Sequence, residues 1–400
     1  MHILDTTLFY SPTSGGVRRY LNAKHAWYAG TPGQQHSLLV PGEVTTLLPG
    51  GVSTIAGRIV PGTFNYRLPL SAHNWAQMLE ALEPDLIEVG DAFHPAWCTL
   101  RVAQRRCIPA VAFCHSHLPR LIGMRCGKAA GRIAARYLGS LYARFDLVLA
   151  PSQFMCDRLR SLGVPRVRRQ PLGVDTTTFH PDRRHTGLRA QLGLPEQVRL
   201  LVYAGRFSAE KNMQALHDAF ALLGRQYHLL VIGGGEQRRP AGNITVLPYR
   251  RDSEALASML ASADALVHAG TAETFGLVVL ETMACGRPVV GVRAAALGEL
   301  ICDEVGVTVA QASGTRIAAA VRELYERDLV AMGRAARARV ESHYTWDVLL
   351  REQLALYASL GEKQRMLPRG ESTAGLVPAP ANSPRPASSR VPGTGPSSLR

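Results

Sequence analysis

Two glutamates, Glu273 and Glu281, frame an apolar run in the segment ETFGLVVLE. The pattern predicts a helix that begins after the Phe275-Gly276 turn, with Glu281 about one turn inside it and Glu273 in the loop before it. A carboxylate can accept hydrogen bonds from a pair of sugar hydroxyls, so both side chains could contact a sugar-bearing ligand. The alternative is that both simply face water, as most acidic side chains do.

Two cations follow an apolar strand in the segment YAGRFSAEKN, residues 203–212. We expect this strand to end at Ala204, Arg206 to lie in the next loop, and Lys211 to open a helix. A guanidinium and an ammonium beside free helix N–H groups would form an anion site. An ordinary loop with solvated charges is an equal alternative, because helix starts are often charged.

Two glycine-rich turns could bring backbone atoms close to the same ligand. Gly15 and Gly16 follow the strand-like MHILDTTLF and precede a helix that starts with Arg18 and Arg19, so their N–H groups could meet a phosphate. Gly234 lies in VIGGGE, which lacks the last glycine of a dinucleotide fingerprint. Any tight turn would also use such glycines. Two carboxylates around an anion site nevertheless suit a nucleoside diphosphate sugar.

Apolar strand candidates alternate with helical stretches along most of the chain. Their Leu, Val, Ile and Ala runs lack polar alternation, which predicts parallel strands covered by helices on both faces. One series precedes residue 165 and another follows residue 195, so we expect an α/β fold with two Rossmann-like domains whose parallel sheets face a central cleft. The runs are SLLV (37–40), DLIEVG (85–90), AVAFC (110–114), DLVLAPS (146–152), RLLVYAG (199–205), HLLVIGGG (228–235), ADALVHAG (263–270) and RPVVGV (287–292).

The domain organisation follows from these series and from a change in composition near the C-terminus. We expect an N-terminal Rossmann-like domain at 1–170 and a C-terminal Rossmann-like domain at 171–343. The segment YTWDVLLREQLALY has amphipathic helical spacing and predicts a closing helix at 344–361. Residues 362–400 are rich in proline and serine, a composition that cannot build a packed core, and predict a disordered tail.

The bulk composition excludes several classes of protein. A length of 400 residues favours two domains, and no apolar run is long enough to cross a bilayer. The N-terminus lacks the pattern of a signal peptide, and the 7 cysteines form no C-x-x-C pair. We therefore expect a cytoplasmic protein without a zinc site. The net charge of +14 suits a nucleic acid, an anionic membrane or a phosphate-bearing ligand.

Part of this positive charge gathers in residues 120–144, RLIGMRCGKAAGRIAARYLGSLYAR. Six basic residues alternate with apolar ones at loosely helical intervals, and no acidic residue interrupts them. This pattern favours docking on anionic lipid headgroups, which would associate the protein with the inner face of the membrane. A solvated helix face or an intramolecular cation patch remains the alternative.

The motifs together resemble glycosyltransferase family 4, the retaining enzymes of GT-B fold. They occur in the family's order over about residues 1–360: the Gly15-Gly16 turn, AFCHSHLP, DLVLAPSQFM, PLGVDTTTF, GRFSAEKN, VIGGG and the Glu-x7-Glu segment that ends ETMACGRPVV. Any one motif would be weak, but all of them in register form a specific signal.

The resemblance implies roles for these residues. Arg206 and Lys211 would neutralise the donor diphosphate, Glu281 would hold the ribose hydroxyls, and Glu273 would contact the transferred sugar. A histidine after an N-domain strand would lie near sugar and acceptor; His115 is our choice, with His117 as its competitor. The resemblance places Gly15, Gly16, Gly234, Phe275, Gly276 and Leu277 in the donor site as well. It also implies that residues 1–170 form the acceptor-side domain and residues 171–343 the nucleotide-sugar-binding domain.

The implied reaction is front-face transfer with retention, without a protein nucleophile, a metal or a cofactor other than a GDP- or UDP-linked sugar. Fixed cations and helix dipoles can stabilise the charge that develops on a leaving diphosphate. No D-x-D metal-binding pair appears in the sequence.

The donor sugar and the acceptor are less closely defined. The form ETFGLVVLE looks most like mannosyltransferase-type members, so mannose is the expected sugar, and the acceptor would be lipid-linked or a saccharide. The family often has a Gly-Gly turn in the loop that faces the donor sugar, where this chain reads RAAALGELI (293–301). Alanines at these positions would change the shape of the donor pocket.

Two other functions fit part of the pattern. A GT-B sugar-nucleotide epimerase would share the fold, but the spacing of the Glu-x7-Glu and G-R-x4-K motifs disfavours it. A non-catalytic nucleotide- or nucleic-acid-binding protein would explain the charge, but it has no need of all four charged site residues. We expect no nucleic-acid partner, because no aromatic-interleaved platform or helix-turn-helix pattern is present.

Overall fold

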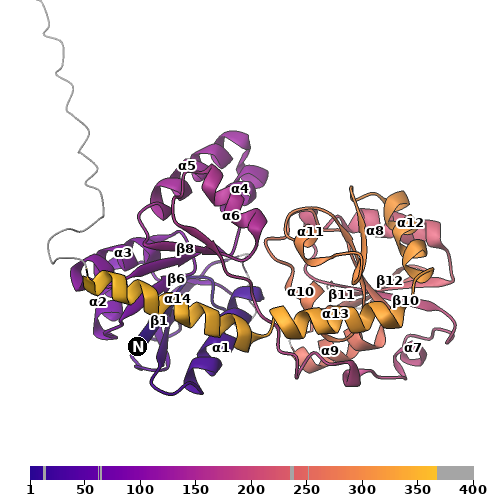
Figure 1. The fold of residues 1–400 in the computed structure, drawn as a ribbon. Coiled ribbons are helices and arrows are strands. Elements are labelled where there is room, and N and C mark those ends of the chain that lie inside the picture. The colour runs from indigo at the N-terminus through magenta and orange to yellow at the C-terminus, as the bar shows by residue number, and fades with distance from the viewer. Residues whose placement is uncertain (12–14, 62, 64, 235–237, 251, 367–400) are drawn as a thin grey trace, which may run out of the picture. The chain divides into compact units, whose positions relative to one another are not determined.

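The computed structural model describes residues 1–11, 15–61, 63, 65–234, 238–250 and 252–366, and two large sheets organise them (Figure 1). In the first sheet every pair of neighbouring strands is parallel, and the strand order is β3-β2-β1-β6-β7-β8-β9. Its strands are β1 (His2–Thr6), β2 (Gln35–Gly42), β3 (Val52–Ala56), β6 (Leu86–Val89), β7 (Ala110–Phe113), β8 (Leu147–Ala150) and β9 (Val167–Arg169).

The second sheet has the order β12-β13-β11-β10-β14-β15-β16. Its strands are β10 (Arg199–Ala204), β11 (Tyr227–Gly234), β12 (Arg238–Ala241), β13 (Ile244–Pro248), β14 (Ala265–His268), β15 (Val289–Val292) and β16 (Gly306–Val309). The edge strand β12 pairs antiparallel with β13, which the sequence did not predict. A separate antiparallel pair joins β4 (Arg58–Ile59) and β5 (Arg67–Leu68). All eight predicted strand runs overlap observed strands, so the expected α/β architecture with two parallel-sheet domains is confirmed.

Helices cover both faces of each sheet. On the first sheet, α1 (Gly16–Ala29) and α14 (Trp346–Met366) share one face, and α2 (Ala72–Ala81), α3 (His94–Arg106), α5 (Lys128–Tyr142) and α6 (Gln153–Ser161) cover the other. On the second sheet, α8 (Met213–Leu223) and α12 (Gly314–Tyr325) lie opposite α9 (Ser253–Ser262), α10 (Leu277–Ala284) and α13 (Leu329–His343). Shorter elements are α4 (Leu118–Cys126), α7 (Leu188–Gln191), α11 (Leu297–Leu300), η1 (Pro181–Arg183) and η2 (Ala209–Lys211).

The strand β10 shows why these apolar runs lack polar alternation. Leu200 and Val202 pack in the core with α9 and α10, whereas Leu201 and Tyr203 pack in the core with α8 and α12. All four side chains are fully buried, so every position along the strand faces a core. Burial on both faces is the arrangement that parallel sheets require.

Each sheet contains one position where the chain order reverses. In the first sheet β1 lies between β2 and β6, and in the second sheet β10 lies between β11 and β14. Open α/β sheets bind ligands at the carboxyl ends of their strands at such switch points. The loops after β1, β6, β10 and β14 are therefore the positions where ligands should bind.

The C-terminal helix α14 returns from the second sheet to the first. The sequence predicted a closing helix at 344–361, whereas α14 continues to Met366. Trp27 on α1 donates a hydrogen bond from Nε1 to Asp347 Oδ1 at 3.0 Å, and Gln170 donates to the carbonyl of Leu349 at 3.1 Å. The part of the predicted tail from residue 367 onward lies outside the described residues.

A buried charge cluster, which the sequence analysis did not predict, attaches α14 to the first sheet. Lys24 Nζ donates to Asp5 Oδ1 at 2.8 Å and to Glu88 Oε2 at 2.9 Å, and all three side chains are fully or almost fully buried. Tyr357 of α14 donates a hydrogen bond to Glu88. A buried carboxylate is tolerated only when it is paired and hydrogen-bonded. The hydrogen bond from Tyr357 to Glu88 therefore helps to hold α14 against the first sheet.

Candidate active site

Two helix N-termini meet where the sequence predicted a diphosphate site. Gly16 is the first residue of α1, and a Cβ at this position would lie only 3.1 Å from Leu277 Cδ1 at the start of α10. Gly276 caps α10 with a φ of 101°, a left-handed conformation that favours glycine. Among the described residues, neither helix has a side-chain cap or an acidic residue in its first turn. Their first N–H groups can therefore bind an anion.

Phe275 anchors the turn before α10 through its ring, and its predicted contact with a donor stays a prediction. Its ring is 4% exposed, packs in the hydrophobic core and lies 6.3 Å from the ring of Tyr344. Burial of the ring fixes the position of the turn before α10. Any contact between Phe275 and a donor would have to come from its backbone.

The loop after β10 carries the predicted cations. The strand ends at Ala204 as predicted, but Lys211 lies in the short 3-10 turn η2 and α8 begins only at Met213. The predicted helix start is therefore wrong by one short turn. Asn212 adopts a left-handed conformation there and donates from its side chain to the carbonyl of Ala269 at 2.8 Å.

The glycines at the end of β11 lie against this loop. Gly233 has a φ of 123°, and a Cβ there would overlap the carbonyl oxygen of Gly205. Gly233 is thus the position where close approach of two backbone segments requires glycine. Gly234, the predicted donor-site residue, lies opposite Pro248 in the β11–β13 ladder, and its contact with a donor stays a prediction.

Glu273 lies in the loop after β14, as predicted, and is held by two partners. Lys211 Nζ forms an ion pair with its carboxylate, and His268 Nε2 lies 3.3 Å from the same Oε1 atom. The backbone N–H of Gly270 donates to His268 Nδ1 at 3.0 Å, so Nε2 carries the proton that faces Glu273. Burial alone would raise the pKa of Glu273, but His268 and Lys211 together hold that pKa well below its usual range.

Glu281 lies one turn inside α10, as predicted, and is 2% exposed. Its carboxylate forms an ion pair with Arg19 of α1, which reaches it from the other domain. Burial raises the pKa of Glu281, and the charge and hydrogen bond of Arg19 partly offset this rise. The carboxylate that the resemblance assigns to a ribose is therefore paired with a protein cation in this structure.

Hydrogen bonds connect the loop of Glu273 to the N-terminal domain. Ser152 Oγ donates to the carbonyl of Thr274 at 2.8 Å, and Thr274 Oγ1 donates to the carbonyl of His115 at 3.0 Å. The backbone N–H groups of Gln153 and Phe154 donate to the carboxylate of Glu299 at 2.8 and 2.7 Å. The structure thus brings His115 next to the loop that carries Glu273.

The two candidate histidines have different environments. His115 stacks on Phe113 with a centroid distance of 4.2 Å, and burial lowers the pKa of its imidazole to about 3. Its Nε2 is buried without a hydrogen-bond partner in the described part of the chain. His117, in contrast, accepts a hydrogen bond from the backbone N–H of Arg120 and caps α4. A neutral imidazole with an unused nitrogen favours His115 as the ligand-contacting residue.

Sequence reasoning missed two features of this site. His268 was predicted only as part of the apolar strand run 263–270. Arg19 was predicted at the start of a helix that could bind a phosphate, and not as the partner of Glu281. The first is a local contact, made where the loop after β14 folds back over His268, and the second depends on the contact between α1 and α10. A single sequence reports neither the strand order nor the packing of helices from two domains.

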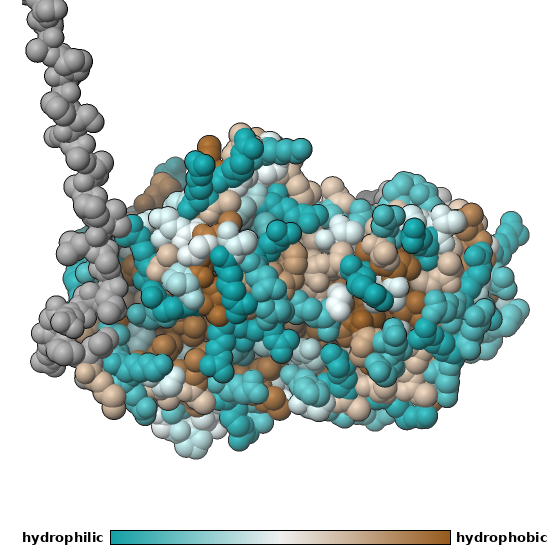
Figure 2. Space-filling view, turned by 45° about the horizontal axis from the view of Figure 1, so that its top comes forward, coloured by the Kyte–Doolittle hydropathy of each residue, from teal (hydrophilic) through white to brown (hydrophobic). Residues whose placement is uncertain are grey.

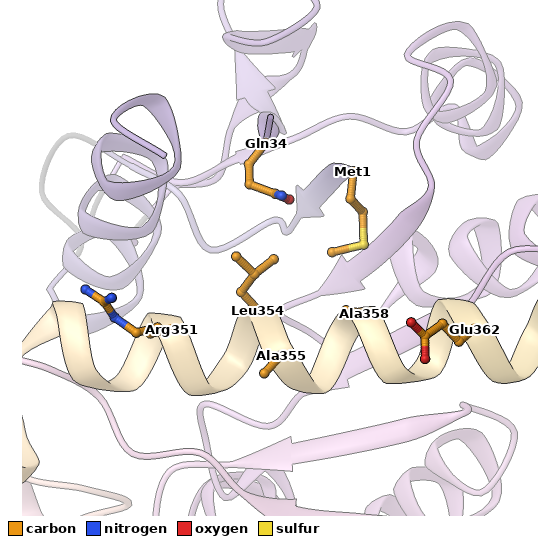
Figure 3. Close-up of a pocket in the computed structure, with 7 residues that line it drawn as sticks. All are labelled: Met1, Gln34, Arg351, Leu354, Ala355, Ala358 and Glu362. Carbon is orange, nitrogen blue, oxygen red and sulfur yellow. The ribbon is translucent and has the colours of Figure 1, made fainter. Parts of the chain in front are cut away.

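A surface hollow elsewhere on the chain contains none of the predicted site residues. It lies along α14, close to the start of β1 (Figure 3), and has a volume of about 380 Å³. Its lining residues are Met1, Gln34, Arg351, Leu354, Ala355, Ala358 and Glu362. None of these side chains is a candidate for catalysis, so we assign this hollow no part in the reaction.

The chain matches two families that together cover most of its length. Residues 15–178 match the family described as Glycosyltransferase Family 4, and residues 186–339 match Glycosyl transferases group 1. The GDP-mannose-dependent alpha-(1-6)-phosphatidylinositol dimannoside mannosyltransferase of Mycobacterium tuberculosis is 34% identical over 381 residues, which cover 90% of this chain and 96% of that protein. A GDP-mannose-dependent alpha-mannosyltransferase of the same species is 28% identical over 253 residues, covering 62% of this chain and 66% of that protein.

Solved structures share the fold at lower identity. Sucrose-phosphate synthase from Thermosynechococcus elongatus superposes with a TM-score of 0.75 at 20% identity, covering 90% of this chain and 99% of that one. Anabaena HepE in complex with UDP-glucose has a TM-score of 0.70 at 21% identity, with coverage of 90% and 100%. At these identities the likeness concerns the fold alone.

Proposed function

This chain belongs to glycosyltransferase family 4, a family of nucleotide-sugar-dependent transferases, and we propose that it moves mannose from GDP-mannose to a mannosylated phosphatidylinositol lipid or a related saccharide. The relative with 34% identity is named for this donor and for a phosphatidylinositol dimannoside acceptor. Its match extends over 90% of the chain and so includes both domains, which supports a shared donor and a related acceptor.

One observation carries the proposal: charged side chains gather at the switch point of the second sheet beside two uncapped helix N-termini. Lys211 and Glu273 come from the loops after β10 and β14, and Glu281 comes from the helix that follows. A diphosphate would receive N–H groups and a cation here, while the carboxylates remain for hydroxyl groups. This is the set of partners that a sugar nucleotide needs.

The same geometry supports a reaction driven by stabilisation of the leaving group. Breaking the bond between the sugar and the diphosphate leaves negative charge on the diphosphate oxygens, where Lys211, Arg206 and the helix N-termini can bind it. The hydroxyl of the acceptor would then attack from the same face of the sugar, with retention of configuration. No side chain is assigned the role of a nucleophile in this proposal. His115, neutral at pH 7, would contact a hydroxyl of the transferred sugar.

A donor screen tests the proposal. We would measure thermal shifts and hydrolysis with GDP-mannose, UDP-glucose, UDP-GlcNAc, UDP-galactose and the free nucleotides, and then transfer to phosphatidylinositol dimannoside. Stabilisation and turnover with GDP-mannose, both reduced in Glu281→Ala, are expected. A preference for a UDP-sugar would contradict the donor assignment. Formation of a β-linked product would contradict retention.

The hairpin of α4 and α5 supports a membrane-bound acceptor, and we propose that it docks on the anionic inner face of the membrane. Leu121, Met124 and Ile133 are exposed hydrophobic residues on these helices, with Ile133 69% exposed. The same two helices and the positions beside the three apolar residues in the sequence carry exposed basic residues, namely Arg120, Arg125, Lys128, Arg132 and Arg136. Hydrophobic and hydrophilic surfaces are interleaved over the first domain in Figure 2. Exposed apolar side chains on helices that also carry exposed cations suit an anionic bilayer.

Vesicle sedimentation tests this surface. No helix in the described ranges is long and apolar enough to cross a membrane. The protein should bind vesicles that contain phosphatidylglycerol but not pure phosphatidylcholine vesicles, and Ile133→Asp should weaken that binding. Val330→Asp is the matched control, because Val330 is 65% exposed on α13 of the second domain. Equal binding by both variants would contradict the assignment of this surface.

A further inference from the structure

Three aromatic residues form a cluster at the carboxyl ends of the strands in the first sheet. The ring of Phe9 lies 5.8 Å from that of Tyr66 and 5.8 Å from that of Phe93, both in edge-to-face geometry. Phe9 follows β1, Phe93 follows β6, and Tyr66 lies between β4 and β5. None of the three rings belongs to the buried core, and Phe93 is 40% exposed.

A buried carboxylate fixes two of these rings in place. Asp91 accepts hydrogen bonds from the backbone N–H groups of Leu8 at 2.7 Å and Phe93 at 2.9 Å, and from Thr7 Oγ1 at 3.0 Å. Burial raises the pKa of Asp91, and these hydrogen bonds partly offset the rise. Burying a carboxyl group costs free energy unless hydrogen bonds compensate it. Through these hydrogen bonds Asp91 holds together the loop of the partly buried Phe9 and that of the exposed Phe93.

The aromatic cluster lies at the switch point of its sheet. Phe9 and Phe93 follow β1 and β6, the two neighbours between which the chain order reverses. The equivalent point in the second sheet carries Lys211 and Glu273. Both sheets therefore place distinctive side chains where α/β folds bind ligands, one set charged and the other aromatic.

Two observations place the cluster beside the proposed reaction centre. Burial raises the pKa of the Tyr66 hydroxyl, and the positive charge of Arg206 partly opposes this rise, so the two side chains are near one another. A Cβ at Gly90 would lie 3.3 Å from Thr7 Cβ and 3.4 Å from His115 Cδ2. The loops that carry the phenyl rings thus adjoin both His115 and the loop of Arg206.

We propose that Phe9, Tyr66 and Phe93 form the subsite for a pyranose ring of the acceptor, an assignment that rests on the proposed transferase function. A pyranose presents a face of C–H groups and a rim of hydroxyls. The C–H face packs on the electron-rich face of an aromatic ring, while polar neighbours bind the rim. The phenolic oxygen of Tyr66 supplies one such polar group. Phe93, the most exposed ring, offers the largest free surface to the sugar.

The experiment uses the full chain and two probe acceptors, octyl α-D-mannopyranoside and phosphatidylinositol dimannoside in detergent micelles. Phe93→Ala should raise the KM for both acceptors about tenfold and change kcat little, because the ring contributes contact area and not chemistry. Phe93→Tyr should restore the wild-type KM. Leu222→Ala, which truncates a 53% exposed side chain on α8, should have no effect. GDP affinity should be equal in all four proteins.

Direct binding separates this inference from the proposed function. Ligand-observed NMR with octyl α-D-mannopyranoside and GDP should show contact with the wild type and its loss in Phe93→Ala, whether or not turnover occurs. Mannoside binding that depends on Phe93 without any transfer from GDP-mannose would retain the subsite and contradict the proposed function. An unchanged KM and unchanged mannoside contact in Phe93→Ala would overturn the subsite. Weaker GDP binding with an unchanged acceptor KM would assign the rings to the nucleobase instead.

Discussion

The ion pair between Arg19 and Glu281 predicts an exchange of partners when the nucleotide binds. Arg19 belongs to the first turn of α1, and Glu281 lies inside α10 with its side chain 3% exposed. If ribose hydroxyls bind Glu281, they must replace Arg19, because the carboxylate is buried and has little room for both. We therefore expect Arg19→Met to tighten the binding of GDP.

The magnitude follows from what the substitution does to the free protein. Arg19→Met leaves a buried carboxylate without its cation when no nucleotide is present, whereas ribose would supply partners in the complex. A hydrogen bond to a charged group contributes about 1.5–3 kcal/mol. Arg19 is 31% exposed, so water screens the pair and the lower end applies. The dissociation constant of GDP should fall about tenfold, since about 1.4 kcal/mol corresponds to that factor.

Isothermal titration calorimetry with GDP on wild type, Arg19→Met, Glu281→Gln and the double variant measures this coupling. Glu281→Gln should weaken GDP binding, and Arg19→Met should have no effect on a protein that already carries Glu281→Gln. Thermal unfolding without nucleotide should show Arg19→Met to be less stable than wild type. Weaker GDP binding in Arg19→Met would refute the reasoning, because it would mean that Arg19 itself binds the phosphates.

Three further predictions concern charged groups of the two domains. Lys211→Ala should lower turnover of the donor by about two to three powers of ten, since a fixed charge at a developing anion contributes roughly 3–4 kcal/mol; near-normal activity would place the stabilising cation elsewhere. Lys24→Met should lower the free energy of unfolding, measured by chemical denaturation, by about 3–5 kcal/mol, because two buried carboxylates lose their cation. As the control, Arg351→Met breaks the exposed Arg351–Asp347 pair and should lower the free energy of unfolding by less than about 0.5 kcal/mol. The pKa of Glu273 lies below its usual 4.5 in the folded protein. The ionised carboxylate of Glu273 should therefore add a constant amount to the free energy of unfolding from pH 5 to 8, and this contribution should be lost only as the pH falls below about 4.5. Thermal unfolding of wild type and Glu273→Gln across this range measures the difference, and a loss that begins near pH 6 would contradict the prediction.

The sequence by itself determined the class of fold and the local setting of the site. Leu200 to Ala204 form a run without polar alternation, which favours a strand buried on both faces, and the structure has such a strand there. The turn before Leu277 and the position of Glu281 in the helix also follow from neighbouring residues. Such features depend on interactions within a few residues, and for that reason they can be read from one sequence.

Only the tertiary structure decided which distant side chains meet. Arg19 reaches Glu281, Lys211 reaches Glu273, and Asp91 joins the loop of Phe9 to the loop of Phe93, all through contacts between separate elements. Each pairing depends on strand order and on the packing of helices from two domains. A residue's type and its neighbours in the chain do not specify these. The sequence therefore indicated the chemical character of each charged site residue, whereas the fold determined its partner and, through that partner, the direction of its pKa shift.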